Sequence, residues 1–183
     1  MMSTEFEQLK EKLDKLLLEK ESILNTIIEV EKKRQEKFTS TLADISKNFS
    51  HIYKDLTGGY GDIRLEEENN IDSGLIIEAS PPGKKILNID SMSGGEKTLT
   101  SLAFLFAIMQ LRSAPFYVLD EVDAALDKAN TIKIANLVKK YSKHTQFIVI
   151  SHNDITTSAA DRVFGVSMED GVSRVFGIEL PRR

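Results

Sequence analysis

The chain has 183 residues, the length of one ordinary domain or of one domain with an extension, which argues against a multidomain enzyme. Its 24 lysines and arginines against 28 aspartates and glutamates give a formal net charge of −4, which argues against a dominant nucleic-acid surface. Cysteine is absent, so thiolate metal sites and cysteine nucleophiles are excluded, and any metal chemistry must use carboxylates. The longest apolar run, 102–109, falls far short of a membrane helix, and the first residues lack the apolar segment of a signal peptide. We therefore expect a cytoplasmic protein without a membrane partner.

A heptad pattern fills the first part of the chain, in which no glycine or proline precedes Gly58. Steps of three and four residues alternate along a seam that consists of Phe6, Leu9, Leu13, Leu16, Lys20, Ile23, Ile27, Val30 and Arg34. The seam resumes at Phe38, and consecutive steps of four there form a stutter. The pattern predicts one helix over about 4–56, roughly 80 Å long at ~1.5 Å per residue, which projects and pairs with a helix from outside the chain. A long helix folded back on its own domain is the alternative.

The second part alternates strand-like and helix-like segments. We predict strands at 63–67, 75–79, 116–119 and 147–150, the last two buried. We predict helices at 99–111, 131–141 and 154–161. A strand, a helix and a strand at this spacing predict a parallel sheet, and Asp170-Gly171 predicts a hairpin of 163–167 with 172–178 at its antiparallel edge. The fold class is therefore α/β, with an arm and neck over 1–56 and a lobe over 57–183.

The tetrapeptide Ser93-Gly94-Gly95-Glu96 precedes the apolar helix. Ser-x-x-Glu is a capping box, which alone explains the serine and the glutamate. Two adjacent glycines in a first helical turn cost about 1 kcal/mol each relative to alanine, so a cap does not explain them. Without side chains at these positions, the free N–H groups and the positive end of the helix dipole are open to an anion such as a phosphate.

Acidic residues follow the strand predicted at 116–119. Asp120 and Glu121 lie at its carboxyl end, where open α/β sheets bind ligands. In nucleotide hydrolysis one such carboxylate holds Mg²⁺ and the next orients or deprotonates the attacking water. An acidic loop end without function is the alternative for this pair, and a helix N-cap is the alternative for Asp127.

A histidine, His152, follows the strand predicted at 147–150. A lone histidine at a strand end is more often structural than catalytic. Here it is expected to neighbour Asp120 and Glu121, where an imidazole can form a hydrogen bond with a γ-phosphate. No G-x-x-x-x-G-K-[ST] motif occurs, because Glu96 stands where the second glycine would be, so the chain lacks a phosphate cradle.

The second part resembles the C-terminal half of the ATPase head of prokaryotic-type SMC (structural maintenance of chromosomes) proteins, which are ABC-type ATPases. The resemblance rests on SMSGGEKTLTSLAFLFAIMQLRSAPFYVLDEVDAALDKAN, with PPGKK before it and TQFIVISHND after it. ABC transporters usually have Asp-Glu-Pro where this chain has Asp-Glu-Val-Asp. The resemblance implies the C-terminal lobe of an ABC-type ATPase head, with the seam as a projecting coiled-coil helix.

The resemblance also implies roles for individual residues and two cofactors, ATP and Mg²⁺. Ser93, Gly94, Gly95 and Glu96 resemble the signature motif, which contacts the γ-phosphate of ATP on the opposite head. Asp120 resembles the Walker B carboxylate that holds Mg²⁺.

Three further acidic or basic positions match the family. Glu121 resembles the catalytic glutamate, Asp127 the D-loop aspartate and His152 the switch histidine, a position that varies among SMC proteins. Met92 departs from the leucine that usually opens the signature, with little change in volume.

The resemblance implies half of an ATP-binding and hydrolysing head that engages a second head around ATP, in chromosome condensation, segregation or DNA organisation. The implied partners are the N-terminal lobe of the same protein with its Walker A motif, a second head, a kleisin subunit, and DNA through the assembled complex. The implied location is the cytoplasm, at the nucleoid. The alternatives are a coiled-coil module that only docks a kleisin-like partner, and half of a related DNA-repair ABC ATPase.

Overall fold

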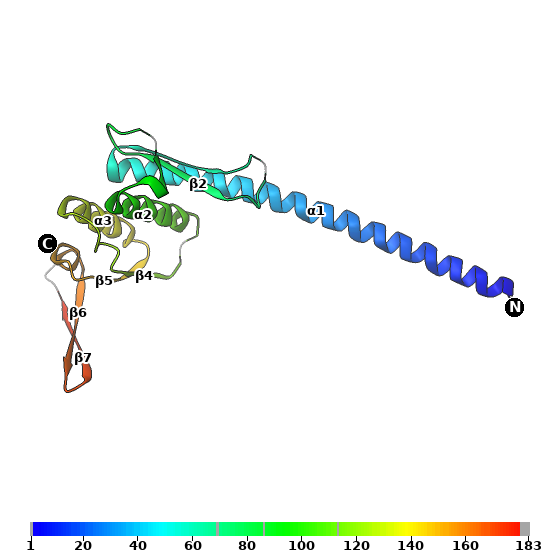
Figure 1. Ribbon diagram of the computed structural model, residues 1–183. Coiled ribbons are helices and arrows are strands. Elements are labelled where there is room, and N and C mark those ends of the chain that lie inside the picture. Colours follow the sequence, from blue (N-terminus) through cyan, green and yellow to red (C-terminus); the bar gives the residue numbers. More distant parts are fainter. Residues whose placement is uncertain (1, 69, 86, 113, 180–183) are drawn as a thin grey trace. The chain divides into compact units, whose positions relative to one another are not determined.

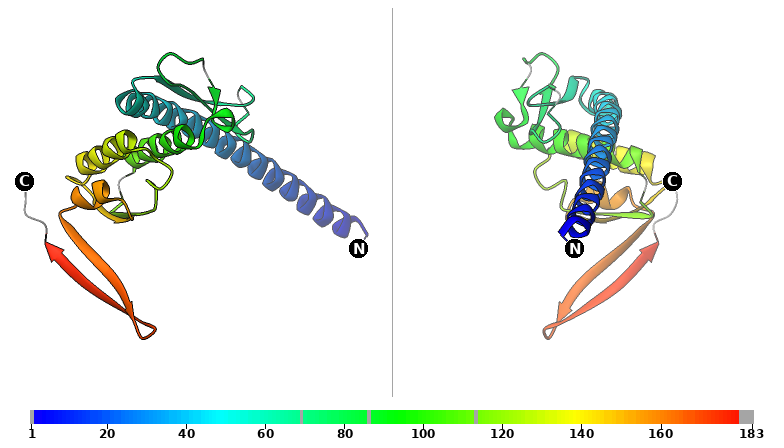
Figure 2. Two further views of the ribbon diagram at one scale, coloured as in Figure 1. Left: turned by 60° about the vertical axis from the view of Figure 1, so that its left-hand side comes forward. Right: turned by 90° about the vertical axis from the view of Figure 1, so that its right-hand side faces the viewer.

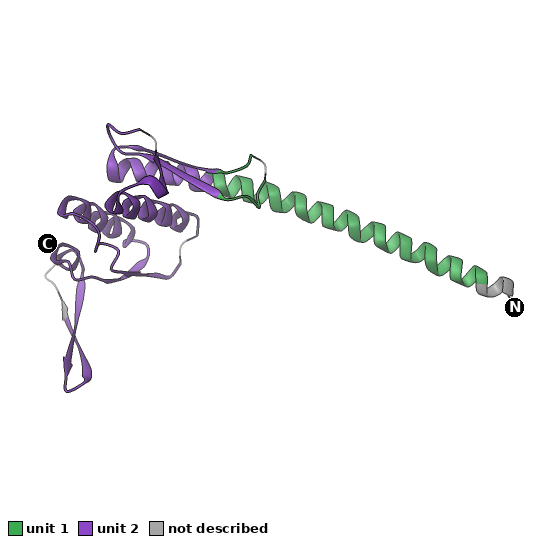
Figure 3. Cartoon of the chain, viewed as in Figure 1, with its two compact units in different colours: residues 1–43, 65–74 green, residues 44–64, 75–183 purple. Residues whose placement is uncertain are grey.

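The computed structural model describes residues 2–68, 70–85, 87–112 and 114–179. These residues form two compact units, of which the first comprises 1–43 with 65–74 and the second 44–64 with 75–183 (Figures 1 and 3). Within the described residues, no helix combines the length and the apolar character that crossing a membrane requires.

The first element, α1, is a single helix over Met2–Thr57, as the heptad pattern predicts. Its side chains from Phe6 to Lys37 are all exposed, including the apolar seam positions. A helix with this pattern is stabilised by packing its seam on another helix. The end of α1 is buried instead, through Phe49, Ile52, Tyr53 and Leu56. Gly58, with φ of +75°, ends the helix and donates its N–H to the Lys54 carbonyl at 2.8 Å.

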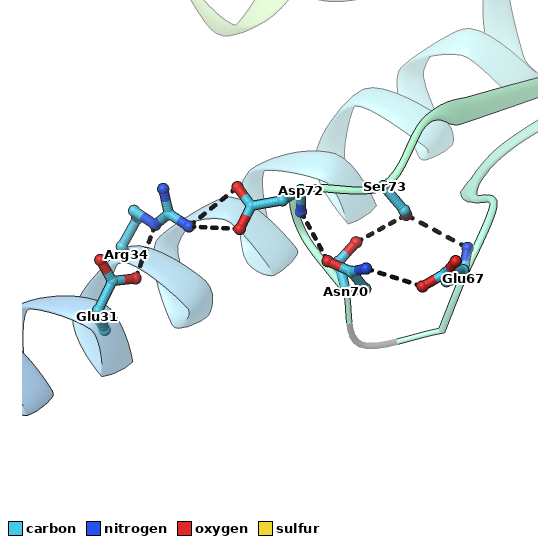
Figure 4. Close-up of polar contacts among 6 residues, drawn as sticks. All are labelled: Glu31, Arg34, Glu67, Asn70, Asp72 and Ser73. Carbon is cyan, nitrogen blue, oxygen red and sulfur yellow. Dashed lines mark hydrogen bonds and ion pairs between the residues drawn. The ribbon is translucent and has the colours of Figure 1, made fainter.

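In the first unit the loop 65–74 contacts α1 through an ion pair (Figure 4). Arg34 Nη2 lies 3.1 and 3.0 Å from the two carboxylate oxygens of Asp72, and Arg34 Nε lies 3.0 Å from Glu31 Oε2. The loop has its own hydrogen bonds, because Asn70 Nδ2 donates to Glu67 Oε2 at 2.8 Å. The Asn70 carboxamide oxygen in turn accepts the Asp72 N–H at 3.1 Å. The backbone of Asp72 is thus held by Asn70, while its carboxylate contacts Arg34 of the helix.

A small sheet in the order β1-β2-β3 contains Tyr60–Leu65, Leu75–Ser80 and Leu87–Asn88. The first two strands confirm the expected pair, although β1 begins three residues earlier than predicted and ends at Leu65. In the added part of the strand, Gly61 lies against α1, where a Cβ would be 2.7 Å from the Phe49 ring. Beyond Leu65 the chain forms the loop, which Glu66 N–H closes on the Gly74 carbonyl at 2.8 Å.

The main lobe alternates helices and strands as predicted. A short 3-10 turn, Ile89–Ser91, leads into α2 (Gly94–Leu111), and then follow β4 (Phe116–Asp120), α3 (Lys128–Tyr141), β5 (Gln146–Ile150) and α4 (Asp154–Ser158). β4 and β5 are parallel, with Leu119 opposite Val149. Phe106 of α2 is fully buried and stacks on Phe147 of β5 at 5.9 Å. α4 ends at Ser158, three residues earlier than predicted, where Ala159 and Ala160 N–H groups turn back to carbonyls of the same helix.

The two parallel strands are covered on one face, whereas the sequence predicts fully buried strands. Tyr117, Leu119, Phe147 and Val149 point to the covered face. The opposite face consists of apolar side chains that are between 46% and 54% exposed, namely Phe116, Val118, Ile148 and Ile150. Parallel strands are normally covered on both faces, and the described residues provide the cover of one. We call these four residues the open face.

The last element is a hairpin of β6 (Arg162–Glu169) and β7 (Val172–Glu179) (Figure 2). Its turn has positive φ at Asp170 (52°) and Gly171 (77°), as the predicted Asp-Gly turn requires. In the described residues it forms a two-stranded sheet of its own, rather than the edge of the β4–β5 sheet. One face carries exposed apolar side chains, namely Phe164, Val166, Met168 and Val175. We call this surface the hairpin face.

Candidate functional site

Ser93 begins α2 as its N-cap, and the predicted capping box forms. The Ser93 N–H and hydroxyl both donate to Glu96 Oε2, at 3.2 and 2.7 Å. The two glycines are not required by crowding or by a positive φ. A Cβ on Gly94 would have no atom within 4 Å, and one on Gly95 would lie 3.5 Å from the Ala125 carbonyl oxygen. The start of α2 is therefore uncovered, which fits the expected approach of a phosphate.

Lys84 is a neighbour of this motif that the sequence patterns did not single out. It follows the turn at Gly83, whose φ is +77°, and its N–H donates to the Pro81 carbonyl at 3.0 Å. Its Nζ lies 2.6 Å from Glu96 Oε1. The hydrogen bond from Lys84, followed by those from the Ser93 side chain and backbone, lowers the pKa of Glu96 from 4.5 to about 2. Glu96 is thus an ionised carboxylate with a fixed counter-ion.

The strands β4 and β5 are parallel neighbours (Figure 1). Their carboxyl ends bring Glu121 and His152 together, as expected from their strand positions. His152 Nε2 lies 3.1 Å from Glu121 Oε1, and the imidazole is 90% exposed. Glu121 has a φ of +46°, which is uncommon for a residue with a side chain and clusters at functional sites. Its N–H donates to the Ile150 carbonyl at 2.9 Å, so the backbone after β4 is tied to the end of β5.

Asp127 caps α3, which was the alternative that the sequence left open. Its carboxylate accepts the Asn130 N–H at 2.8 Å and the Asn130 side-chain amide at 3.3 Å. The same segment passes the start of α2, since Ala125 is the neighbour of Gly95. The hydrogen bonds of the described residues do not join the signature motif to Glu121 or His152. The chain therefore holds two separate groups of candidate residues.

Asp123 is a second residue that the motif analysis did not assign. It is 4% exposed and accepts the Ser151 hydroxyl on Oδ2 at 2.6 Å. The same oxygen accepts the hydroxyl of Thr156. The signal in the sequence was its place two residues after Glu121, but nothing in a single sequence indicates that the side chain is buried or which hydroxyls it binds.

The donor set at the end of β4 fits Mg²⁺ only in part. The Asp120 carboxylate makes no hydrogen bond or ion pair with the described residues, so its oxygens remain available. Among these residues no group of three or more histidine, aspartate or glutamate side chains converges on a metal position. Mg²⁺ usually keeps several waters and binds one or two carboxylates together with substrate phosphates. One carboxylate is therefore sufficient only if a nucleotide supplies further oxygens.

Residues 2–174 match the family described as RecF/RecN/SMC N terminal domain. A relative called chromosome partition protein Smc, from Methanocaldococcus jannaschii, is 49% identical over 176 residues. The match covers 96% of this chain and 15% of that protein, so the chain spans about one seventh of the curated relative.

Two solved structures resemble the chain at 49% identity. One is the Smc head domain from Pyrococcus furiosus with an extended coiled coil, bound to the C-terminal domain of ScpA, with a TM-score of 0.83 over 94% of this chain and 44% of that chain. The other comes from work on ATP-driven dimerisation and DNA-stimulated activation of SMC ATPases, with a TM-score of 0.73 over 79% of this chain and 89% of that chain. Sequence, fold and motif order agree, and the chain belongs to the RecF/RecN/SMC N-terminal domain family, in which it matches the ATPase head of SMC proteins.

Proposed function

We propose that the chain supplies half of an ATP-hydrolysing SMC head, with an arm and neck over 1–56 and the C-terminal lobe over 57–183. The observation that carries the proposal is the contact of His152 Nε2 with Glu121 Oε1 at 3.1 Å, at the end of the strand in which Asp120 is the last residue. A module that only docks a partner has no use for this arrangement. The family supports the same assignment, since its members include SMC ATPases.

In the proposed reaction each residue has a distinct task. Asp120 would hold Mg²⁺, which would shield the charge of the phosphates. Glu121 would orient the attacking water and accept its proton, and His152 would donate a hydrogen bond to the γ-phosphate. Asp127, the N-cap of α3, would act as the D-loop aspartate and contribute to nucleotide binding.

The signature motif is proposed to act on ATP that another head carries. The chain contains no G-x-x-x-x-G-K-[ST] cradle, yet the start of α2 is uncovered at Gly94. We expect a phosphate at this helix start to arrive with the N-terminal lobe of a second head, as the resemblance to the signature motif implies. We propose that two heads engage around ATP in this way, with each chain completed by its own N-terminal lobe.

The further partners follow from the relatives. A Pyrococcus furiosus Smc head was crystallised with the C-terminal domain of ScpA. We propose a kleisin of this kind as a partner, with the hairpin face as its contact surface and the neck from Phe38 to Leu56 as the alternative surface. DNA would be bound through the assembled complex at the nucleoid, as the name chromosome partition protein of the relatives suggests.

The test uses a head assembled from this chain and its N-terminal lobe. Glu121→Gln keeps the shape and polarity of the side chain but cannot accept a proton from water. We expect ATP binding to persist, ATP turnover to fall by at least 100-fold, as for other lost acid–base groups, and ATP-bound dimers to accumulate. Phosphate release and light scattering measure the two effects. Turnover at the parental rate would remove Glu121 as the base, whereas the absence of turnover in the parental head would favour the docking module.

A further inference from the structure

The buried carboxylate of Asp123 has no role in the proposed chemistry, yet it is the most enclosed acidic side chain among the described residues. Burial of an ionisable group is costly unless hydrogen bonds compensate. Here one oxygen, Oδ2, accepts two hydroxyls from a different part of the lobe, those of Ser151 and Thr156. Asp123 therefore links two segments of the lobe through the hydroxyls of Ser151 and Thr156, and we call these three residues the junction.

The hydrogen bonds around Asp123 hold the residues directly before and directly after His152. Ser151, the residue before it, donates its hydroxyl to Asp123 at 2.6 Å. The same Ser151 oxygen accepts the N–H of Asn153, the residue after it, at 2.9 Å. Asn153 then caps α4 by accepting the Ile155 N–H at 2.9 Å. The backbone that carries the exposed imidazole is thus fixed by its two neighbours.

The other end of the junction lies two residues from Glu121. The turn from Glu121 to Leu126 is closed by Ala124 N–H on the Glu121 carbonyl and by Leu126 N–H on the Asp123 carbonyl, both at 3.1 Å. A displacement of Asp123 would therefore move the backbone of Glu121, which is already held at a positive φ. The Asp123 side chain thus joins the segment that carries Glu121 to the segment that carries His152.

We propose that Asp123 is a positioning residue that holds His152 against Glu121 through the Ser151 and Thr156 hydroxyls. The inference rests on the proposed function, because it assigns a task in the same reaction. It goes beyond that function in naming the residue that sets the geometry of the pair.

The variants separate acceptor geometry from charge. Asp123→Ala removes the acceptor, whereas Asp123→Asn keeps an oxygen that both hydroxyls can reach. Misplacement of a catalytic group by about 1 Å costs on the order of 100-fold, so we expect Asp123→Ala to lower kcat by roughly 10- to 100-fold in the full-length protein. Asp123→Asn should recover most of that loss, and the KM for ATP should change little in both. Asp154→Ala, an exposed acid on the adjoining helix, is the matched control and should leave kcat unchanged.

A double-mutant cycle with His152→Ala distinguishes positioning from general destabilisation. If Asp123 acts through His152, Asp123→Ala should lower kcat much less in the His152→Ala protein than in the parent. A purely structural role would give the same fold-change in both backgrounds. Should Asp123→Ala fail to fold, Thr156→Val replaces it in the cycle, since the valine has nearly the same shape but lacks the hydroxyl; the expected loss is then a few-fold.

Equal fold-changes in the two backgrounds, or parental kcat in a folded Asp123→Ala protein, would overturn the inference while the ATPase assignment stands. Unchanged kcat in His152→Ala would do the same, because a pair without effect needs no positioning. A full-length protein without any ATP turnover would overturn the proposed function, and the inference with it.

Discussion

The signature motif presents an electrostatic problem at the scale of single residues. Glu96 carries a negative charge at a helix start that is proposed to accept a phosphate, and two negative charges close to each other repel. Lys84 compensates that charge at 2.6 Å. Because the pKa of Glu96 is lowered to about 2, its contribution to stability is complete above the ordinary carboxyl range and is lost only as the pH falls towards 2. Near neutral pH the ion pair of Lys84 with Glu96 therefore does not change with pH.

Lys84→Met leaves the charge of Glu96 uncompensated. We expect ATP-dependent dimerisation of the assembled head to need about 3- to 10-fold more ATP, with the larger effect at low salt, since screening weakens the repulsion. Light scattering across an ATP titration measures it. Lys85→Met, at the exposed next residue, is the control and should resemble the parent. Lys84→Met with Glu96→Gln should recover most of the loss, and a double variant as poor as the single one would contradict charge compensation.

The candidate site could be predicted only where a pattern along the chain carries it. Glu121 and His152 were found because carboxyl ends of neighbouring parallel strands meet, which is a local rule. Asp123 and Lys84 act through partners 28 and 12 residues away, and no periodicity encodes which hydroxyl or carboxylate they reach. The contribution of Asp127 as a helix cap was visible from its position, whereas its role towards a nucleotide stays a prediction.

At the scale of elements, the hairpin of β6 and β7 has one apolar face, whereas the other face combines the apolar Val172 and Phe176 with charged side chains. Val166 and Val175 are opposite each other on the hairpin face, and both are about two-thirds exposed. Val172 lies opposite Glu169, on the other face of the same strand pair. An exposed apolar strip of this kind is typical of a protein-binding surface. The apolar alternation predicted the hairpin, but it could not predict that the hairpin leaves the β4–β5 sheet, because strand pairing between sheets is a long-range property.

Val175→Glu tests the hairpin face as the kleisin contact. Burying a valine side chain contributes about 1.5–3 kcal/mol, so its replacement by a charge should weaken binding of the kleisin C-terminal domain at least tenfold. Isothermal titration gives the affinity, and the thermal midpoint of the head should stay within a few degrees. Ser167→Glu introduces a glutamate on the other face, opposite Arg174, and should bind as the parent does. Equal loss in both variants would place the contact elsewhere or indicate a distorted hairpin.

At the scale of the whole molecule, the open face of β4 and β5 indicates that a second layer must cover the sheet. Phe116 and Val118 of β4 and Ile148 and Ile150 of β5 leave roughly half of their surface in water, although the strands read as fully buried in the sequence. The prediction was made from composition, which records that a strand is apolar on both faces but not where its second cover comes from. A parallel strand pair of this kind requires a second layer, and the N-terminal lobe is our proposal for it.

Titration of the chain alone with Mg-ATP should therefore give no measurable heat of binding, since the chain offers no cradle for the phosphates. Adding the N-terminal lobe should produce a complex with micromolar ATP affinity. Val118→Asp on the open face should abolish complex formation, because an unpaired charge would be buried at the junction. Ile132→Asp, on the exposed side of α3, is the matched control and should not. Micromolar affinity of the chain alone would refute the half-site proposal.

The ion pair of Arg34 with Asp72 gives a reference point for the rotation of the arm helix about its own axis. Arg34 occupies a seam position, and its guanidinium is bound by Asp72 of a loop in its own chain. At ~100° per residue, seven residues added before Arg34 would turn the distal arm by only about 20°, whereas four would turn it by about 40° in the opposite sense. The direction in which the distal seam faces is therefore tied to the loop 65–74. Insertions before Arg34 should therefore be tolerated only in lengths that leave this direction nearly unchanged, such as seven residues.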